Sequence, residues 1–416
     1  MAAFDFNRDC RCLTIDRPKL AGLLEKAGLE SGLSAGLIAQ AAPLFASVPV
    51  YVGSQDLSRI RRIIQAVESV VLRTAYRDAA LAKAPAIARQ NERHLGVFFG
   101  YDFHIGDEGP QLIEINTNAG GALLNAFLAR AHSACCTEMD ELTTAPEGIE
   151  QAFVTMFESE FRRSRSDTPL KRIAIVDDDP EGQFLYPEFM LFRELFKRAG
   201  YDATILDARA LTFDGKLRGN GEVIDLVYNR CTDFYFDAPE HAALREAYLR
   251  DAAVITPHPR AHALYADKRN LALLSDLTFL TSMGIPPETM RVLADGIPKT
   301  ILVDPADAEV LWAARKQYFF KPIHGFGSKA AYRGDKLTKG TWAELLTKPY
   351  VAQRTVPPSE RMIELDGQAF PLKLDVRAYT YAGEVQLFAS RLYMGQTTNF
   401  RTQGGGFAPV FTRSLS

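Results

Sequence analysis

The sequence has no apolar run that approaches the ~18 residues of a membrane-spanning helix, and its N-terminus lacks the apolar stretch of a signal peptide. We therefore expect a cytoplasmic protein with no membrane partner. No charge sign dominates either, because 48 Lys and Arg residues stand against 51 Asp and Glu residues, for a net charge of -3. Such a balance creates no global field to hold a polyanion, so we expect small-molecule substrates rather than nucleic acid.

Cysteine is also scarce, with five residues in the chain: Cys10, Cys12, Cys135, Cys136 and Cys231. An odd number spread over a long chain argues against a disulfide framework, and we expect free thiols. Neither Cys10-x-Cys12 nor the adjacent pair Cys135-Cys136 has the CxxC spacing that places two sulfurs on one tetrahedral ion. The sequence therefore gives no reason to expect a zinc site.

The chain is longer than a single hydrophobic core usually organises, so we expect two or three domains. Its pattern predicts a mixed α/β (α+β) protein made of five segments. These are a helical region over 1–94, a hairpin with following helices over 95–165, a Rossmann-like unit over 170–258, a unit with a glycine-rich loop over 259–349, and strands over 350–416. The Rossmann-like unit is predicted from the strand–helix–strand order of RIAIVDDD, PEFMLFRELFKRAG and YDATILDA.

A β-hairpin is predicted where VFFGYDFHIG and QLIEIN flank the turn residues Asp107 to Pro110. Alternation places Glu114 and Asn116 on one face, where Asp102 of the first strand can join them. Mg²⁺ prefers a few carboxylate and amide oxygens, with substrate phosphates completing its shell. A solvated edge hairpin is the alternative reading.

Two lysines lie in segments that suit a phosphate site. Lys321 ends a predicted strand in YFFKPIHGFGSK, where Gly325 and Gly327 would let backbone N–H groups approach phosphate oxygens. This segment has neither the Walker A frame nor the GxGxxG frame, and an ordinary hairpin loop is the alternative. Lys268 lies near the start of a predicted helix, where a lysine is often merely solvated.

Charged residues recur on a strand near the C-terminus. Alternation places Lys373, Asp375 and Arg377 on one strand face among apolar neighbours, which is unlike a plain solvated surface. Arg391 and Arg401 follow on the next strand and loop. Arginines suit bidentate contacts to phosphate or carboxylate oxygens.

Together these segments resemble the ATP-grasp superfamily. In the usual chain order of that superfamily, a pre-domain sheet is followed by two lysine segments and an adenine hinge. An Asp-x-Arg strand, an arginine strand and a final D…E-x-N metal hairpin come after them. YADKRNLALL, FKPIHGFGSK and PYVAQRTVPP look like the two lysine segments and the hinge. DVRAYTYAGEVQLFASRLYMG is similar to the matching strands of glutathione synthetases and ribosomal-protein glutamate ligases. The metal hairpin alone is out of place, because EINTNAGG comes early, as in eukaryotic-type glutathione synthetases and glutathionylspermidine synthetases. The resemblance thus implies a circularly permuted ATP-grasp fold with a Rossmann-like pre-domain.

The resemblance also implies the roles of particular residues. Mg²⁺ would be bound by Asp102, Glu114 and Asn116. ATP would be bound by Lys268, Lys321, Gly325, Gly327, Ser328, Gln353, Arg354, Val356, Lys373 and Asp375, and the catalytic side chains would be Arg391, Arg377 and Lys321. The substrate candidates are Asn118, Gly120, Gly121, Asn229, Arg230, Asn399 and Arg401, with a structural role as the alternative for Asn229 and Arg230. The hairpin should pair beside the segment near Arg391 and Arg401.

The activity that this resemblance implies is an ATP-dependent carboxylate–amine ligase that forms an amide through an acyl phosphate, with an amino acid, polyamine or short peptide as substrate. A phosphotransferase and a catalytically silent nucleotide-binding protein remain alternatives. The loop that reads HGFG lacks the acidic residue of eukaryotic-type glutathione synthetases, so the resemblance does not name the product. The oligomeric state also stays open, with a homodimer as one alternative.

Overall fold

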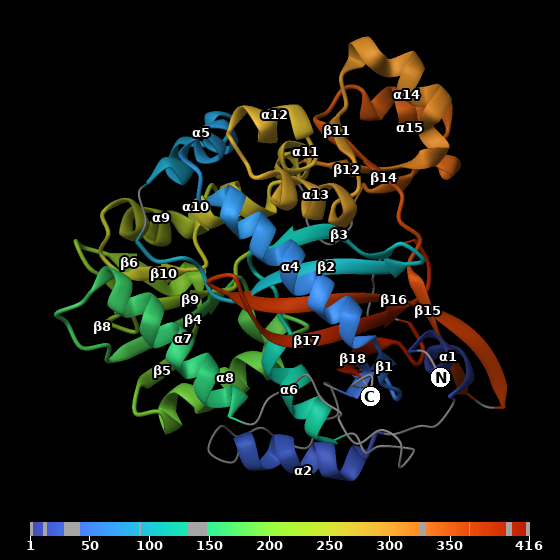
Figure 1. Cartoon of the computed structure of the whole chain (residues 1–416). Coiled ribbons are helices and arrows are strands. Elements are labelled where there is room, and N and C mark those ends of the chain that lie inside the picture. The colour runs from blue at the N-terminus through green and yellow to red at the C-terminus, as the bar shows by residue number, and fades with distance from the viewer. Residues whose placement is uncertain are drawn as a thin grey trace.

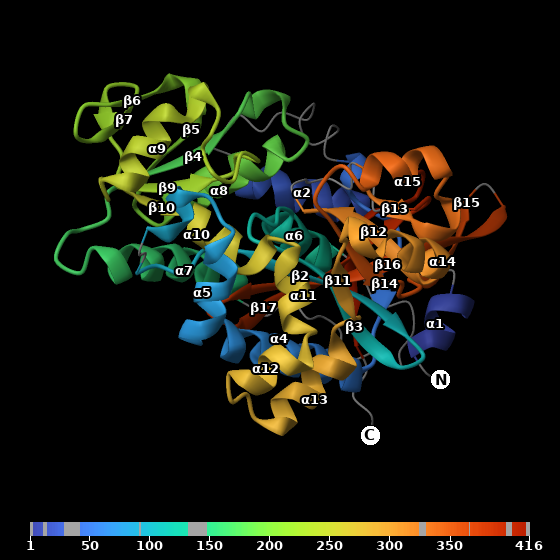
Figure 2. The ribbon, with the colours of Figure 1, turned by 90° about the horizontal axis from the view of Figure 1, so that it is seen from above.

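The computed structural model of the chain describes residues 3–10, 15–28, 42–90, 93–131, 148–323, 330–365, 367–396 and 402–412. Figures 1 and 2 show a central sheet with a parallel sheet toward one end of the molecule and a smaller antiparallel sheet toward the other. No helix in these described ranges is long and apolar enough to cross a membrane.

The central sheet joins strands from both ends of the sequence. Its order is β1 (Val50–Tyr51), β18 (Gly406–Phe411), β17 (Glu384–Tyr393), β16 (Gln368–Tyr381), β2 (Phe99–Gly106) and β3 (Gly109–Asn116), while β15 (Ser359–Leu365) pairs with the first half of β16. The predicted hairpin β2–β3 is present and pairs antiparallel with β16, which places Asp102 opposite Arg377. The hairpin therefore lies one strand away from Arg391 on β17, and β16 fills the place between them.

One face of the central sheet is covered by α4 (Ser54–Val71), as Figure 1 shows. Apolar residues of this helix at helical spacing, such as Ile60 and Ile64, are fully buried and share a core with Phe103 and Ile115 of the hairpin. Because side chains alternate along a strand, the polar residues Asp102 and Glu114 are left for the opposite face.

The parallel sheet has the predicted Rossmann-like order. Its strands are β10 (Val254–Thr256), β9 (Leu226–Asn229), β4 (Arg172–Asp177) and β5 (Asp202–Asp207), and every neighbouring pair is parallel. Ile173 and Ile175 of β4 pack in the core that contains α7 (Ile149–Ser164) and α8 (Tyr186–Arg198), whereas Val176 packs in the core that contains α9 (Ala242–Leu249). Helices thus bury both faces, as parallel sheets require.

The smaller antiparallel sheet carries the second lysine segment. Its order is β11 (Thr300–Leu302), β14 (Tyr350–Arg354), β12 (Tyr318–Pro322) and β13 (Tyr332–Arg333). The helices α14 (Ala308–Ala314) and α15 (Lys339–Leu345) cover it through a core that includes Leu311, Phe320 and Trp342. This core is separate from that of the central sheet, so Lys321 on β12 reaches the hairpin across a junction between two packed units.

The remaining elements connect or cover these sheets. They are α1 (Ala3–Asp9), α2 (Arg17–Gly28), α5 (Thr74–Ala82), α6 (Ala122–Ala131), α10 (Pro259–Ala261), α11 (Arg269–Leu274), α12 (Leu277–Ser282), α13 (Pro287–Gly296), and a small sheet of β6 (Leu211–Phe213), β7 (Leu217–Gly219) and β8 (Glu222–Val223).

Candidate functional site

Two predicted lysines meet the predicted metal hairpin at the junction between β12 and β3. The Lys321 ammonium donates to the carbonyl oxygen of Ile113 at 2.7 Å and to Gln353 Oε1 at 2.8 Å. Lys268, immediately before α11, places its Nζ atom 3.7 Å from Glu114 Oε1. Segments that lie far apart in the sequence thus bring two cations and one carboxylate together, and we call these three side chains the lysine pair with Glu114.

The electrostatics at this place favour an added anion. Burial lowers the pKa of Lys321 to about 8; the Glu114 carboxylate opposes this shift, and the Lys268 ammonium adds to it. A buried cation close to a second cation is stabilised by negative charge brought from outside. The lysine pair with Glu114 therefore suits phosphate oxygens.

A second group of charges lies on the same face of the central sheet. Asp102 on β2 accepts hydrogen bonds from Arg377 Nε at 2.6 Å and Nη2 at 2.7 Å, and from Arg391 Nη2 at 2.8 Å. Arg391 also donates to both oxygens of Asp375, at 2.8 and 3.0 Å. These four side chains, which we call the arginine–aspartate network, are largely buried and contain two positive and two negative charges.

Charge compensation inside this network keeps Asp102 ionised. Burial of Asp102 opposes ionisation, but the nearby Arg377 and Arg391 guanidinium groups outweigh it and lower the pKa of the carboxyl group. Because the arginines bond bidentately to carboxylates, the network also fixes the register of β2, β16 and β17.

The structure brings the three predicted metal ligands together but leaves them unequally exposed. Asp102 and Glu114 are directly opposed on β2 and β3, and Asn116 Nδ2 donates to Asp102 Oδ2 at 3.0 Å. Asp102 is fully buried under two arginines, whereas the side chain of Glu114 retains 35% of its exposure. Glu114 is therefore the more accessible carboxylate of the two.

The predicted hinge borders the same junction. The side chain of Gln353 is buried, and its Nε2 atom makes no hydrogen bond within the described residues. The Val356 carbonyl accepts a hydrogen bond from His104 Nδ1 at 2.7 Å. Arg354 points to solvent and is held through its backbone N–H, which donates to the Lys299 carbonyl at 2.8 Å.

Several predicted residues lie elsewhere. Lys373 donates to the carbonyl oxygen of Gly395, on the loop after β17, rather than joining the arginine–aspartate network. The predicted residues Gly325, Gly327, Ser328, Asn399 and Arg401 lie outside the described residues.

The predicted substrate residues after β3 connect the central sheet to the parallel sheet. Asn118 Nδ2 donates to the carbonyl oxygens of Arg230 and Cys231 at 2.9 and 3.1 Å, and Arg230 Nη1 donates back to Asn118 Oδ1 at 2.5 Å. At Gly120 a Cβ atom would come within 2.3 Å of Leu185 Cδ1 and 2.7 Å of Arg230 Nη2, so a larger residue would displace these side chains. Asn118, Gly120 and Arg230 are thus brought together.

Asn229 and Gly121 have contacts that support the backbone. Asn229 Nδ2 donates to the Pro257 carbonyl at 3.2 Å, and its Oδ1 accepts from the Cys231 N–H at 3.1 Å. Gly121 has a φ of +95°, which favours glycine, and its N–H donates to Glu188 Oε2 at 2.7 Å. Asn229 fits the structural alternative that its sequence position left open.

Three site residues were missed by sequence reasoning. His104 lies two positions after Asp102, and Tyr379 lies two positions after Arg377, so alternation along the strand could have found both. Glu188 comes from a helix with no site motif. Tyr379 donates from its hydroxyl to the Gly120 carbonyl at 2.8 Å, and Glu188 holds the N–H groups of Gly121 and Leu123. Both side chains position the loop at 118–121.

A cavity of about 1020 Å³ lies beside the hinge. Its lining includes Arg354 and Val356 but not Lys268, Lys321 or Glu114. Ile105 and Leu374, which also line it, alternate with residues of the charged face and so belong to the other face of the central sheet. The candidate site is accordingly located by its side-chain contacts and not by this cavity.

Comparison with solved structures identifies the architecture. A glutathione synthetase-like effector, GSS30, from Globodera pallida matches with a TM-score of 0.58 and 11% sequence identity, over 96% of this chain and 98% of that one. The fold is ATP-grasp-like. Because the identity is low, this likeness concerns the ATP-grasp-like fold alone.

Other ATP-grasp-like matches are weaker. A candidate gamma-glutamylcysteine synthetase from Methylobacillus flagellatus gives a TM-score of 0.46 at 9% identity, over 86% of this chain and 87% of that one. The ATP-grasp ligase PsnB, complexed with minimal precursor, Mg and ADP, gives 0.31 at 14% identity, over 57% of this chain and 87% of that one. Neither overlap supports further inference. No protein-family model matches the sequence, and no curated protein is detectably similar to it.

Proposed function

We propose that the chain is an ATP-dependent carboxylate–amine ligase, which couples cleavage of ATP to ADP and phosphate with formation of an amide through an acyl phosphate. The observation that carries this proposal is the meeting of Lys268 and Lys321 with Glu114 on the metal hairpin. Two cations beside one accessible carboxylate suit a nucleotide phosphate chain with its divalent cation. An ATP-grasp-like fold is consistent with this reading.

The residues at the junction fit ATP and Mg²⁺ in their charge and in their unused hydrogen-bonding capacity. Lys268 and Lys321 would hold phosphate oxygens, while the buried and unsatisfied Nε2 atom of Gln353 is a donor available to the nucleotide. Glu114 and Asn116, with Asp102 beside them, would hold Mg²⁺. When bound, ATP and Mg²⁺ would supply the phosphoryl group and neutralise its charge.

The arginine–aspartate network would work by positioning. Arg377 is bonded side-on to Asp102 and keeps that carboxylate ionised next to the metal hairpin. Arg391 lies between Asp102 and Asp375 and would present a fixed positive charge to the reacting phosphoryl group. Preorganised charges of this kind need no reorganisation during the reaction, which is how such sites lower a barrier.

The substrate carboxylate would lie toward the loop at 118–121 and Arg230. Arg230 is buried, and its Nε atom makes no hydrogen bond within the part of the chain that the structure describes. Its guanidinium also lies over the rings of Phe189 and Tyr228, which fixes its plane. A guanidinium so held suits a carboxylate of an amino acid or short peptide.

We further propose that the strand order is a circular permutation of the usual ATP-grasp order. The hairpin of residues 99–116 is paired with β16 of residues 368–381, which supports a metal hairpin supplied from the early part of the sequence. We also propose the division of the chain into the five segments 1–94, 95–165, 170–258, 259–349 and 350–416.

Phosphate release measured with panels of amino acids, polyamines and short peptides tests the ligase proposal. A ligase releases ADP and phosphate only when both an acid and an amine are present, and an amide product accumulates. A phosphotransferase would instead release ADP without an amine and yield a stable phosphorylated product. Absence of any stimulated ATP cleavage across the panels would contradict both activities.

A further inference from the structure

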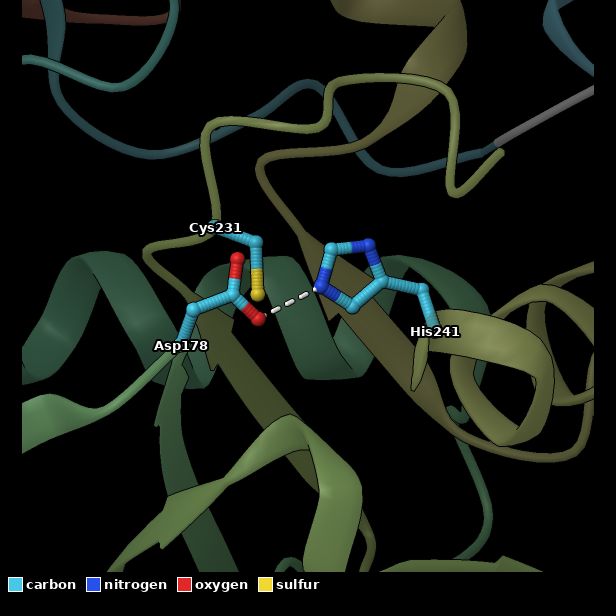
Figure 3. Close-up of side chains that lie close together, drawn as sticks. All are labelled: Asp178, Cys231 and His241. Carbon is cyan, nitrogen blue, oxygen red and sulfur yellow. Dashed lines mark hydrogen bonds and ion pairs between the residues drawn. The ribbon is translucent and has the colours of Figure 1, made fainter. Parts of the chain in front are cut away.

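A second cluster of reactive side chains lies in the Rossmann-like unit, away from the lysine pair with Glu114. Asp178 follows β4, Cys231 follows β9, and His241 ends a short 3₁₀ helix at Pro239–His241. A carboxylate oxygen, the thiol sulfur and an imidazole nitrogen all lie within 4.8 Å of one another. Figure 3 shows how the three side chains converge. The carboxyl ends of neighbouring parallel strands meet at one edge of a sheet, which explains why residues distant in sequence converge here.

The three donors differ in kind in a way that suits a transition metal. Thiolate, imidazole and carboxylate are the ligand types that Zn²⁺ takes in proteins, and three protein ligands leave a fourth position for water or substrate. Cys231 and His241 are fully buried, while the side chain of Asp178 retains 48% of its exposure. The site is therefore shielded on the sulfur and imidazole side and accessible from solvent on the carboxylate side.

A supporting carboxylate fixes the orientation of the imidazole. His241 Nδ1 lies 2.8 Å from Asp233 Oδ2, and that same oxygen accepts the Ala238 N–H at 2.8 Å. This arrangement turns His241 Nε2 toward Asp178, with Nε2 and Asp178 Oδ1 separated by 2.8 Å. A carboxylate on the far nitrogen of a ligating histidine is the usual outer-shell partner in zinc sites.

A nucleophilic role for Cys231 fits the geometry less well. The thiol is fully buried, so it is poorly placed to reach a substrate from solvent. Both nitrogens of His241 are hydrogen-bonded to carboxylates and not to the sulfur.

We propose that Asp178, Cys231 and His241 bind one zinc ion and that Asp233 positions the His241 ring. The Cys231 carbonyl accepts a hydrogen bond from Asn118 at 3.1 Å, so a bound ion would also fix the backbone beside the candidate substrate residues. This proposal stands on its own donors and does not depend on the ligase activity.

Metal content of the full chain gives the first test. After removal of metals by chelation and dialysis, titration with Zn²⁺ should restore one equivalent bound per chain. Replacement by Co²⁺ should produce a sulfur-to-cobalt charge-transfer band. Absence of bound zinc, or of that band, in a folded wild-type chain would overturn the proposal.

Variants then assign the donors. Cys231→Ser should abolish the charge-transfer band and Asp178→Asn should weaken zinc binding, whereas Cys10→Ser, which changes a cysteine outside the cluster, should alter neither. Asp233→Asn should weaken zinc binding by about 10–100-fold while keeping the band, because it changes the orientation of the His241 ring rather than a ligand.

A band that persists in Cys231→Ser would show that another cysteine holds the metal and would overturn the assignment. Asp178→Asn changes a half-exposed side chain, so it keeps the test decisive if the Cys231 variant fails to fold.

Discussion

The arginine–aspartate network and the lysine pair with Glu114 lie on the same side of the central sheet but differ in how completely their charges are matched. In the network, Arg377 and Arg391 are bonded to Asp102 and Asp375 at 2.6 to 3.0 Å. In the pair, Lys268 Nζ lies 3.7 Å from Glu114 Oε1, and Lys321 is close enough to both side chains for its pKa to respond to their charges.

This difference distinguishes a structural frame from a candidate binding site. A matched, buried network holds strands in register and stabilises itself, because removal of one partner leaves an uncompensated charge. Two cations that lie close together gain free energy when an anionic ligand binds beside them. The sequence presents both groups simply as charged residues, mostly on strands, and only the contacts they make in the structure tell them apart.

Substitution of Glu114 should have the largest effect on activity. We expect Glu114→Ala to lower ATP consumption by about 1000-fold, since it removes the accessible carboxylate that would hold the cation at the reacting phosphate. The free energy of unfolding should change by less than about 1 kcal/mol, because the side chain is partly exposed and only loosely paired. Glu108→Ala, in the exposed turn of the same hairpin, is the matched control and should be inert. Unchanged ATP turnover in Glu114→Ala would contradict the assignment of Glu114 as a ligand of the metal ion.

Substitution of Asp102 should chiefly affect stability. Asp102→Asn should lower the free energy of unfolding by about 3–5 kcal/mol, because it leaves the buried Arg377 without its ion-pair partner. Asp202→Asn, which breaks an exposed pair with Arg172, should cost less than about 1 kcal/mol. Denaturant titration of both variants measures the contrast. Equal small losses would show that the network is not the frame described above.

The pH dependence of ATP use should report Lys321. Its pKa is lowered to about 8, so the ammonium is charged below that pH and loses its proton as the pH rises through it. The kcat/KM for ATP should therefore fall roughly tenfold between pH 7 and pH 9. Lys321→Arg should flatten this fall, because a guanidinium stays protonated throughout. An identical profile in that variant would assign the titration to another group.

Arg354 should show the smallest effect. Its side chain points to solvent while its backbone makes the contact to Lys299, so Arg354→Ala should change the KM for ATP by less than about twofold. Lys321→Met is the matched comparison and should raise that KM well beyond this range. A large effect in Arg354→Ala would place the nucleotide against the outer face of the hinge.

Local patterns predicted the elements well because turn chemistry and alternation act over a few residues. The hairpin at Asp107 to Pro110, the parallel strand order around β4 and the position of Lys268 before a helix are all present in the structure. These features depend on backbone preferences that neighbouring residues determine.

Pairings between distant segments were harder to predict. The Asp102–Arg377 bond joins residues 275 positions apart, and the choice of β16 as the hairpin's partner depends on how whole strands pack. Asp178, Cys231 and His241 share no motif spacing, so their convergence follows only from the strand order of the parallel sheet. The position of His104 beside the site could have been predicted, because this residue alternates with Asp102 on one strand.

Calorimetric titration of the full chain with Mg·ATP tests the central claim most directly. The wild-type chain should bind one Mg·ATP, binding should require Mg²⁺, and the Lys268→Met, Lys321→Met double variant should show no measurable heat of binding while keeping its fold. Equal affinity in the wild type and the double variant, or no binding by the wild type, would contradict the assignment of the lysine pair with Glu114 as the nucleotide site.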